Sequence, residues 1–230
     1  MTITCVLFDF SGTLFRIEPA ERWLRAVLDA SGIAAPPDAV ARWAEELEAA
    51  GALPGGSAPR RIPEHLAEWW ATRDVTADHH RATYTALARQ VRLPDPALYD
   101  ALYDRHMTPE AWEPYPDARE VLAALRERGV GVAVVSNIGW DPRPVFRAHG
   151  LDRFVDAYAL SYEHGVQKPD GRLFRTACEA LGREPRQALM VGDDRYADGG
   201  AAKVGCAVHF VDHLPARERP AALRPVLELL

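Results

Sequence analysis

Short apolar runs alternate with amphipathic segments through the second half of the chain, from about residue 116 onward. Four of these runs are rich in β-branched residues and too short for helices, which predicts buried strands at 130–135, 155–160, 188–191 and 206–211. Apolar residues at helical spacing occupy the segments around them and predict helices at 117–128, 144–149, 173–181 and 197–204. Repeated strand–helix units of this kind predict a parallel sheet covered by helices on both faces.

One more strand opens the chain, and a long helical block separates it from the other four. Residues 2–8 are mostly apolar or β-branched, which indicates a fully buried strand. The block that follows keeps helical spacing up to Trp112, apart from a Gly- and Pro-rich loop at 51–63, and no strand is expected in it. Its tryptophans are expected to form its own core, at positions 23, 43, 69 and 70.

These patterns together predict the domain organisation. We expect an α/β protein with a three-layer, Rossmann-like core of parallel strands, made from residues 1–16 and 113–230. Residues 17–112 are expected to form a small all-helical unit inserted after the first strand.

Composition narrows the choice of partners and compartment. The chain has 230 residues and a net charge of -6, which disfavours nucleic acid and acidic membrane surfaces, because both reward basic patches. No apolar run approaches the ~18 residues that cross a bilayer, and the first residues carry no leader pattern. Cys5, Cys178 and Cys206 are scattered within apolar stretches, so we expect reduced core cysteines in a cytoplasmic protein. The sequence sets no oligomeric state.

Polar side chains gather where the predicted strands end. Asp9 and Thr13 follow the first strand, Ser136 and Asn137 the second, and Asp193, Asp194 and Asp198 the fourth. Lys168 lies in the loop before the helix at 173–181, and only one other lysine, Lys203, occurs in the chain. Because parallel strands bring their carboxyl ends to one edge of a sheet, these groups are expected to converge there.

Carboxylates brought together in this way repel one another, and a Mg²⁺ ion relieves the repulsion while binding phosphate oxygens. Lys168 would supply a compact positive charge for an anionic substrate and for the nucleophile. Ser136 and Asn137 would donate hydrogen bonds to the transferred group. The set is the one that phosphoryl transfer requires, with Asp9 as covalent nucleophile.

The four segments, in this order and with a helical insert after the first, resemble the haloacid dehalogenase (HAD) superfamily over the whole chain. The resemblance implies that Asp9 attacks the substrate and that Mg²⁺ is held by Asp9, the backbone carbonyl of Ser11, and Asp193. It implies that Ser136 binds the phosphoryl group, with Thr13 and Asn137 beside it, and that Lys168 balances charge. Asp198 is the candidate for a supporting acid, with Asp194 as its competitor for the metal. The insert corresponds to the helical cap of one branch of the family.

One position departs from the phosphatases of that family. They carry a second aspartate two residues after the nucleophile, which protonates the leaving oxygen and later activates water; this chain has Ser11 there. A hydroxyl does no acid–base work near neutral pH, and such a loss typically costs ~10²–10⁴-fold in rate. A phosphatase with this sequence therefore needs a good leaving group or a proton from the cap, where the candidate histidines are His65, His79, His80 and His106.

Three other functions compete with a Mg²⁺-dependent phosphatase of a small phosphorylated metabolite. A haloacid dehalogenase also lacks the second acid, but it needs no metal, and the acids at 193, 194 and 198 favour one. A phosphonate hydrolase uses a cap lysine, and residues 17–112 contain none. A catalytically silent protein that binds a phosphorylated ligand or a protein partner remains as the alternative from another class.

Overall fold

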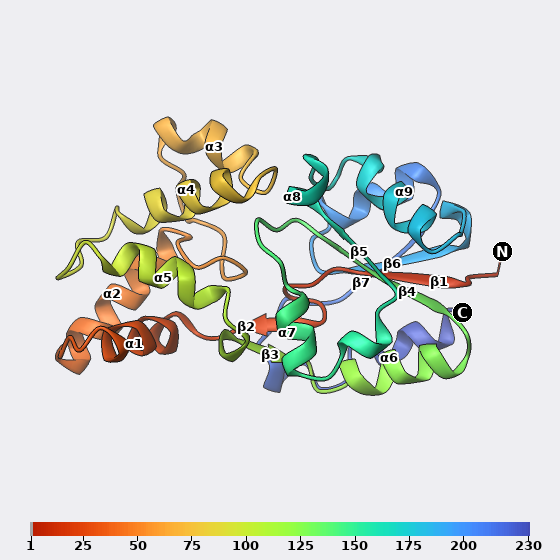
Figure 1. The fold of residues 1–230 in the computed structure, drawn as a ribbon, viewed down its shortest axis with the longest axis horizontal. Helices are drawn as coiled ribbons and strands as arrows, with labels where there is room; N and C mark the ends of the chain where they lie inside the picture. The colour runs from red at the N-terminus through yellow and green to blue at the C-terminus, as the bar shows by residue number, and fades with distance from the viewer. Residues whose placement is uncertain (1) are drawn as a thin grey trace.

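The computed structural model describes residues 2–230, so the first residue of the expected core lies outside the described part. The α/β part of the structure is built on a five-stranded parallel sheet with strand order β5-β4-β1-β6-β7 (Figure 1). The strands are β1 (Cys5–Phe8), β4 (Gly131–Ser136), β5 (Ala157–Leu160), β6 (Ala188–Gly192) and β7 (Ala207–Phe210). Each lies within one or two residues of a predicted strand, except that β1 begins three residues late. The predicted fold class is confirmed.

β1 lies at the centre of the sheet and is buried on both faces. It pairs with β4 on one side and β6 on the other, and its four residues are fully buried. Because successive side chains of a strand point to opposite faces, Cys5 and Leu7 pack with α9, whereas Val6 and Phe8 join the core on the α6 side. A strand without a polar position is therefore expected in this place.

Helices cover both faces of the sheet, as Figure 1 shows. On one face lie α8 (Ser161–His164) and α9 (Gly171–Ala180), and on the other α6 (Ala118–Glu127) and α7 (Arg143–Ala148). The segment predicted as a helix at 197–204 is a 3₁₀ helix, Asp198–Val204. Two successive glycines weaken an α-helix there, and the second, Gly200, lies so close to Pro169 that a Cβ would approach its carbonyl oxygen to 2.5 Å.

Five helices form the helical unit, which lies between β1 and β4 in the sequence and to the left in Figure 1. They are α1 (Ala20–Ala30), α2 (Pro37–Ala49), α3 (Ala67–Ala71), α4 (Ala77–Ala88) and α5 (Leu98–His106). Trp23 is buried and ties α1 to α5 by donating from its indole nitrogen to the Leu102 carbonyl at 2.9 Å. The expectation that all four tryptophans form the core of this unit is wrong. Trp69 is 43% exposed, and Trp70 lines a cavity described below.

A small ribbon that the sequence pattern did not indicate joins the helical unit to the sheet. β2 (Phe15–Ile17) pairs antiparallel with β3 (Trp112–Pro114), so the chain leaves and returns at the same place. Strands of three residues are too short for an alternating pattern to stand out. The ribbon begins and ends within three residues of the predicted boundaries at 16/17 and 112/113, and those boundaries remain a prediction.

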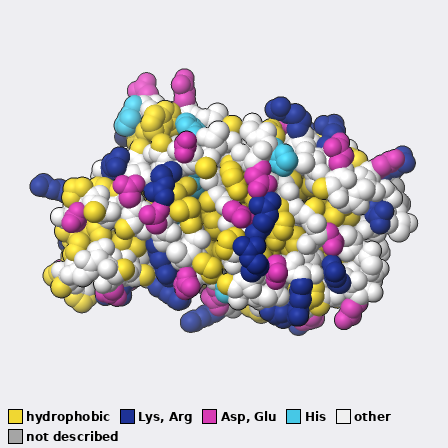
Figure 2. All heavy atoms as spheres, in the orientation of Figure 1, with side chains coloured by type: hydrophobic (Ala, Val, Ile, Leu, Met, Phe, Trp, Pro, Cys, Tyr) yellow, Lys and Arg dark blue, Asp and Glu magenta, His cyan; other side chains and the backbone are white. Residues whose placement is uncertain are grey.

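The surface and the cysteines agree with the composition. Figure 2 shows basic and acidic side chains interspersed over one face, with apolar patches between them. Cys5, Cys178 and Cys206 are free and buried. Among residues 2–230, no helix combines the length and apolar character that crossing a membrane requires.

The burial of two histidines in the helical unit predicts that the folded protein loses stability at acid pH. His80 and His106 stack with ring centroids 5.8 Å apart, and burial lowers the pKa of His106 to about 3 and that of His80 well below its usual value. The unfolded chain takes up these protons near pH 6.5 and the folded chain does not, so stability is full above that pH and falls below it. The loss is about 1.4 kcal/mol per pH unit for each histidine.

The free energy of unfolding of the unchanged chain is expected to fall between about pH 6.5 and pH 5. In His106→Gln we expect this fall to be smaller by about 2 kcal/mol. Urea unfolding midpoints at the two pH values, for the variant and the unchanged chain, measure this. His65→Gln, at an exposed position, is the matched control. An equal acid loss in His106→Gln and the unchanged chain would contradict the prediction.

Candidate active site

The carboxyl ends of three strands and one loop meet around a single cavity. Asp9 follows β1, Ser136 ends β4, Asp193 follows β6, and Lys168 lies in the loop before α9; all four line a cavity of about 330 Å³. The convergence expected from the parallel sheet is therefore present in the structure. The helical unit supplies the opposite wall of the same cavity.

Lys168 lies at the centre of the polar cluster. Its Nζ is 2.7 Å from Oδ1 of Asp9 and 2.6 Å from Oδ1 of Asp198, and all three residues are buried. Burial would lower the pKa of the ammonium, but the carboxylates of Asp198 and Asp9 raise it above its ordinary value. Burial, with Asp198 and Asp193 nearby, raises the pKa of Asp9 despite the opposing charge of Lys168. The ammonium therefore stays charged, and the carboxyl groups of Asp9 and Asp198 crowd against it.

Asp193 is held from the opposite side. Oδ2 of Asp193 lies 2.5 Å from Nδ1 of His213, and the Thr13 hydroxyl donates to its Oδ1 at 3.4 Å. Burial opposes ionisation, yet the hydrogen bond and charge of His213, with Lys168 beyond, hold the pKa of Asp193 below its usual value. Gly12, at φ +82°, lets the loop after β1 pass close by, since a Cβ there would lie 2.3 Å from Oδ2 of Asp193.

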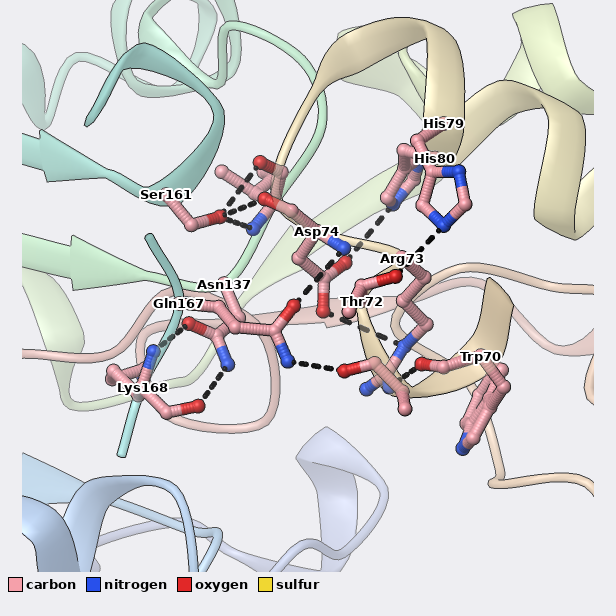
Figure 3. Close-up of polar contacts among 12 residues, drawn as sticks. Trp70, Thr72, Arg73, Asp74, His79, His80, Asn137, Ser161, Gln167 and Lys168 are labelled. Atoms are coloured by element: carbon pink, nitrogen blue, oxygen red, sulfur yellow. Dashed lines mark hydrogen bonds and ion pairs between the residues drawn. The ribbon is translucent and has the colours of Figure 1, made fainter. Parts of the chain in front are cut away.

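The remaining predicted residues differ in what they contact. Ser136 is buried at the cavity wall, whereas Thr13 is fully buried and is not among the residues that line the cavity. Asn137 makes two hydrogen bonds with the backbone of Lys168, accepting from its N–H at 2.6 Å and donating to its carbonyl at 3.0 Å (Figure 3). Thr13 is thus placed to orient Asp193, and Asn137 to fix the loop that carries Lys168.

Asp194 and Asp198, the two further acids considered from the sequence, have different hydrogen-bond partners. Asp194 accepts at Oδ1 from the backbone N–H groups of Tyr196 and Ala197, so this oxygen closes a turn. Asp198 is fully buried, pairs with Lys168 through Oδ1, and accepts from the Asp194 N–H at 3.0 Å through Oδ2. Asp198 therefore belongs to the buried cluster, and Asp194 lies at its rim.

The cluster fits a divalent cation. One oxygen from each of Asp9, Asp193 and Asp198 lies within 4.8 Å of the others. Three carboxyl groups crowd around one ammonium in this buried site. Carboxylate and carbonyl oxygens are the donors that Mg²⁺ prefers. The side chains of Asp9 and Asp193 are 11% and 12% exposed, whereas that of Asp198 is 0% exposed, so Asp9 and Asp193 are the side chains best able to hold the ion.

The wall formed by the helical unit has a polar part and an apolar part. Arg73, Asp74, His80 and Tyr84 form the polar part, and Trp70 and Trp112 are the aromatic residues of this wall, with Phe10 and Trp140 contributed by the sheet side. The loop at 53–58 closes over Ser11, whose hydroxyl donates to the Gly55 carbonyl at 3.3 Å. Of the four histidines considered from the sequence, only His80 lines the cavity.

Three residues at the site were missed from the sequence: Asp74, His213 and Arg219. Arg219 is buried and donates from its guanidinium to the carbonyls of Gly12 and Thr13, with the cation 3.2 Å from the centre of the Tyr115 ring. His213 and Arg219 follow the last strand, where no motif marks them. Asp74 lies between α3 and α4, and only its position next to the cavity distinguishes it.

Comparisons with known proteins agree with this geometry. Residues 3–205 match the family model described as a haloacid dehalogenase-like hydrolase. The chain is 30% identical to (S)-2-haloacid dehalogenase 4A of Burkholderia cepacia over 64% of its own length and 60% of that protein. It is 32% identical to ribulose-1,5-bisphosphate 5-phosphatase of Halopiger xanaduensis over 65% of its length and 64% of that protein.

The chain thus matches less than two thirds of the length of either curated relative. Its structure is similar to that of a HAD phosphatase from Thermococcus onnurineus, with a TM-score of 0.58 and 25% identity, over 92% of this chain and 86% of the other. The relatives include both phosphatases and dehalogenases, so the choice between them depends on the residues of this site.

Proposed function

We propose that this chain, which belongs to the haloacid dehalogenase-like hydrolase family, is a Mg²⁺-dependent phosphatase of a small phosphorylated metabolite. The observation that carries the proposal is the buried cluster of Asp9, Asp193 and Asp198 around Lys168. A dehalogenase transfers no phosphoryl group and does not require so much negative charge beside its nucleophile. In this proposal residues 17–112 are a cap that closes over the substrate and excludes water.

In the proposed reaction the carboxylate of Asp9 attacks the phosphorus atom, and the leaving alkoxide departs in line with it. Lys168, 2.7 Å from Asp9, holds the nucleophile in place and balances the charge of the phosphoryl oxygens. Ser136 donates a hydrogen bond to the same oxygens. Asn137 holds the loop that carries Lys168 in place through its hydrogen bonds to the Lys168 backbone. Water then hydrolyses the phosphoryl-aspartate and restores Asp9.

Asp9, Asp193 and the backbone carbonyl of Ser11 would hold the Mg²⁺ ion. When bound, the ion supplies charge neutralisation for the carboxylates and the phosphate oxygens. This role does not depend on the side chain at position 11, so the serine leaves the proposed metal site intact.

The experiment that tests the function measures phosphate release from an aryl phosphate and from a panel of sugar and nucleotide phosphates. We expect turnover with Mg²⁺ and a loss of at least ~10²-fold in EDTA, restored by added Mg²⁺. A parallel assay follows halide release from 2-chloropropionate, for which no turnover is expected. Halide release that is unaffected by EDTA, without phosphate release, would identify a dehalogenase instead.

A catalytically silent phosphate-binding protein gives a third pattern, with neither product released. Mass spectrometry after a rapid acid quench then decides, because only an enzyme of the proposed kind carries a phosphoryl group on Asp9.

A further inference from the structure

Position 11 leaves the proposed reaction without the acid that phosphatases of this family carry two residues after the nucleophile. The hydroxyl of Ser11 is occupied by the Gly55 carbonyl at 3.3 Å. In-line attack by Asp9 places the leaving oxygen across the phosphorus atom from Asp9. That direction points to the wall formed by the helical unit, so the group that protonates the leaving oxygen is sought there.

Four titratable side chains of the helical unit line this wall: Arg73, Asp74, His80 and Tyr84. Arg73 keeps its proton at all working pH values. His80 is bound at Nδ1 to the Tyr103 hydroxyl at 2.6 Å, and burial lowers its pKa well below the usual value, so it stays neutral. Burial raises the pKa of Tyr84 further above neutrality. Asp74 is the one carboxyl among the four.

The backbone of Asp74 is fixed to the core on both sides. The Ser161 hydroxyl donates to the Asp74 carbonyl at 2.6 Å, and the Asp74 N–H donates to Oε1 of Gln167 at 3.3 Å (Figure 3). Nε2 of Gln167 donates to the Ala71 carbonyl at 2.8 Å. Gln167 directly precedes Lys168, so the same loop positions Asp74 and the proposed catalytic lysine.

The carboxyl group of Asp74 has charged and polar neighbours, but none holds it by a short hydrogen bond. Oδ2 lies 3.4 Å from Nε of Arg73, and Oδ1 lies 3.6 Å from Nε2 of His80. Figure 3 shows it between Arg73 and the Asn137 and Gln167 side chains. Burial raises the pKa of this carboxyl above its usual value, although Arg73, Lys168 and His79 oppose the shift. Such a group holds a proton more readily than an exposed aspartic acid.

We propose that Asp74, from the helical unit, is the general acid and base that Ser11 cannot be; this inference rests on the proposed phosphatase function. As the bond from phosphorus to the leaving oxygen breaks, its electron pair stays on that oxygen, which takes the Asp74 proton and departs as the alcohol. The Asp74 carboxylate then takes a proton from water as the water oxygen attacks phosphorus. The bond to Asp9 breaks with its electrons returning to the carboxylate, and inorganic phosphate is released.

The test compares Asp74→Asn with the unchanged chain on two substrates of different leaving-group basicity. A nitrophenolate leaves without a proton, so we expect a burst of one nitrophenol per active site in Asp74→Asn, followed by slow turnover because the base is missing. With an alkyl phosphate, the leaving oxygen needs the acid already in the first step. In Asp74→Asn the rate of that step and the steady-state rate are therefore both expected to fall by ~10²–10⁴-fold relative to the unchanged chain. Asp78→Asn, at an exposed position on α4, is the matched control.

Two further measurements distinguish chemistry from structure. Asp74→Asn given the aryl phosphate accumulates more phosphoryl-Asp9 at steady state than the unchanged chain does, and mass spectrometry measures both levels. In the unchanged chain, the rate of Asp9 phosphorylation varies only weakly with the basicity of the leaving alcohol, and this test requires no variant to fold.

Equal losses on aryl and alkyl phosphates, with no accumulated adduct, overturn the role of Asp74. A steep dependence on leaving-group basicity in the unchanged chain overturns it as well. Failure of the phosphatase proposal is a different result, in which the unchanged chain releases no phosphate from any substrate and carries no phosphoryl group on Asp9.

Discussion

Asp9→Asn is expected to lower phosphate release by at least ~10⁴-fold, because the amide oxygen that replaces the carboxylate is a poor nucleophile. The change keeps size and shape, and it removes one of the three carboxylates crowded around Lys168. The variant should therefore fold as well as the unchanged chain, with a midpoint of thermal unfolding that is equal or higher. Loss of activity without loss of stability separates chemistry from structure.

Steady-state rates and the mass of the acid-quenched protein measure this outcome. Asp78→Asn serves again as the control, since it makes the same chemical change at an exposed position. Residual turnover above about one per cent of the original rate, with a phosphoryl group on another residue, would falsify the assignment of Asp9 as nucleophile.

Lys168→Met is expected to have the largest combined effect on stability and activity. The ammonium is buried and pairs with Asp9 at 2.7 Å and Asp198 at 2.6 Å, so its removal leaves buried carboxylates without a counter-charge. Breaking a buried ion pair from one side typically costs about 3–5 kcal/mol. We expect a loss of that size in urea unfolding without Mg²⁺, together with loss of phosphatase activity.

A second substitution tests the cause of that loss. Asp198→Asn added to Lys168→Met removes one of the stranded carboxylates and keeps an acceptor for the Asp194 N–H, so it should recover part of the stability but no activity. Lys203→Met, at the other lysine of the chain, lies on the surface and should change neither. A double variant no more stable than Lys168→Met would show that charge is not the cause.

Much of the fold followed from local patterns. The five strands are short and mostly apolar runs, and the parallel sheet follows from their alternation with helices. The strand predicted at 206–211 is the exception in burial, since β7 at the edge of the sheet is only partly covered. The cluster of Asp9, Lys168 and Asp193 could be anticipated because a parallel sheet brings strand ends to one edge wherever they lie in the sequence. These predictions need no knowledge of how separate parts of the chain dock.

The features that were missed depend on docking. Ser11 faces Gly55 only because the loop at 53–58 closes over it, and Trp70 lines a cavity only because the helical unit lies against the sheet. Gly139 marks the same contact, since a Cβ there would lie 2.2 Å from Cβ of His80. Apolar periodicity reports which face of a helix is buried, but not what that face or its polar neighbours meet.

The hydrogen bonds from Arg219 to the Gly12 and Thr13 carbonyls form only after most of the chain has been synthesised. Arg219 holds the carbonyl of Gly12, 207 residues earlier in the chain, and β1 pairs only with strands that begin at Gly131 and Ala188. At ~5–20 residues per second, the ribosome needs about 10–40 s to make the intervening residues. A nascent chain therefore carries the loop after β1 without this support until Arg219 has been made, about 10–40 s after Gly12.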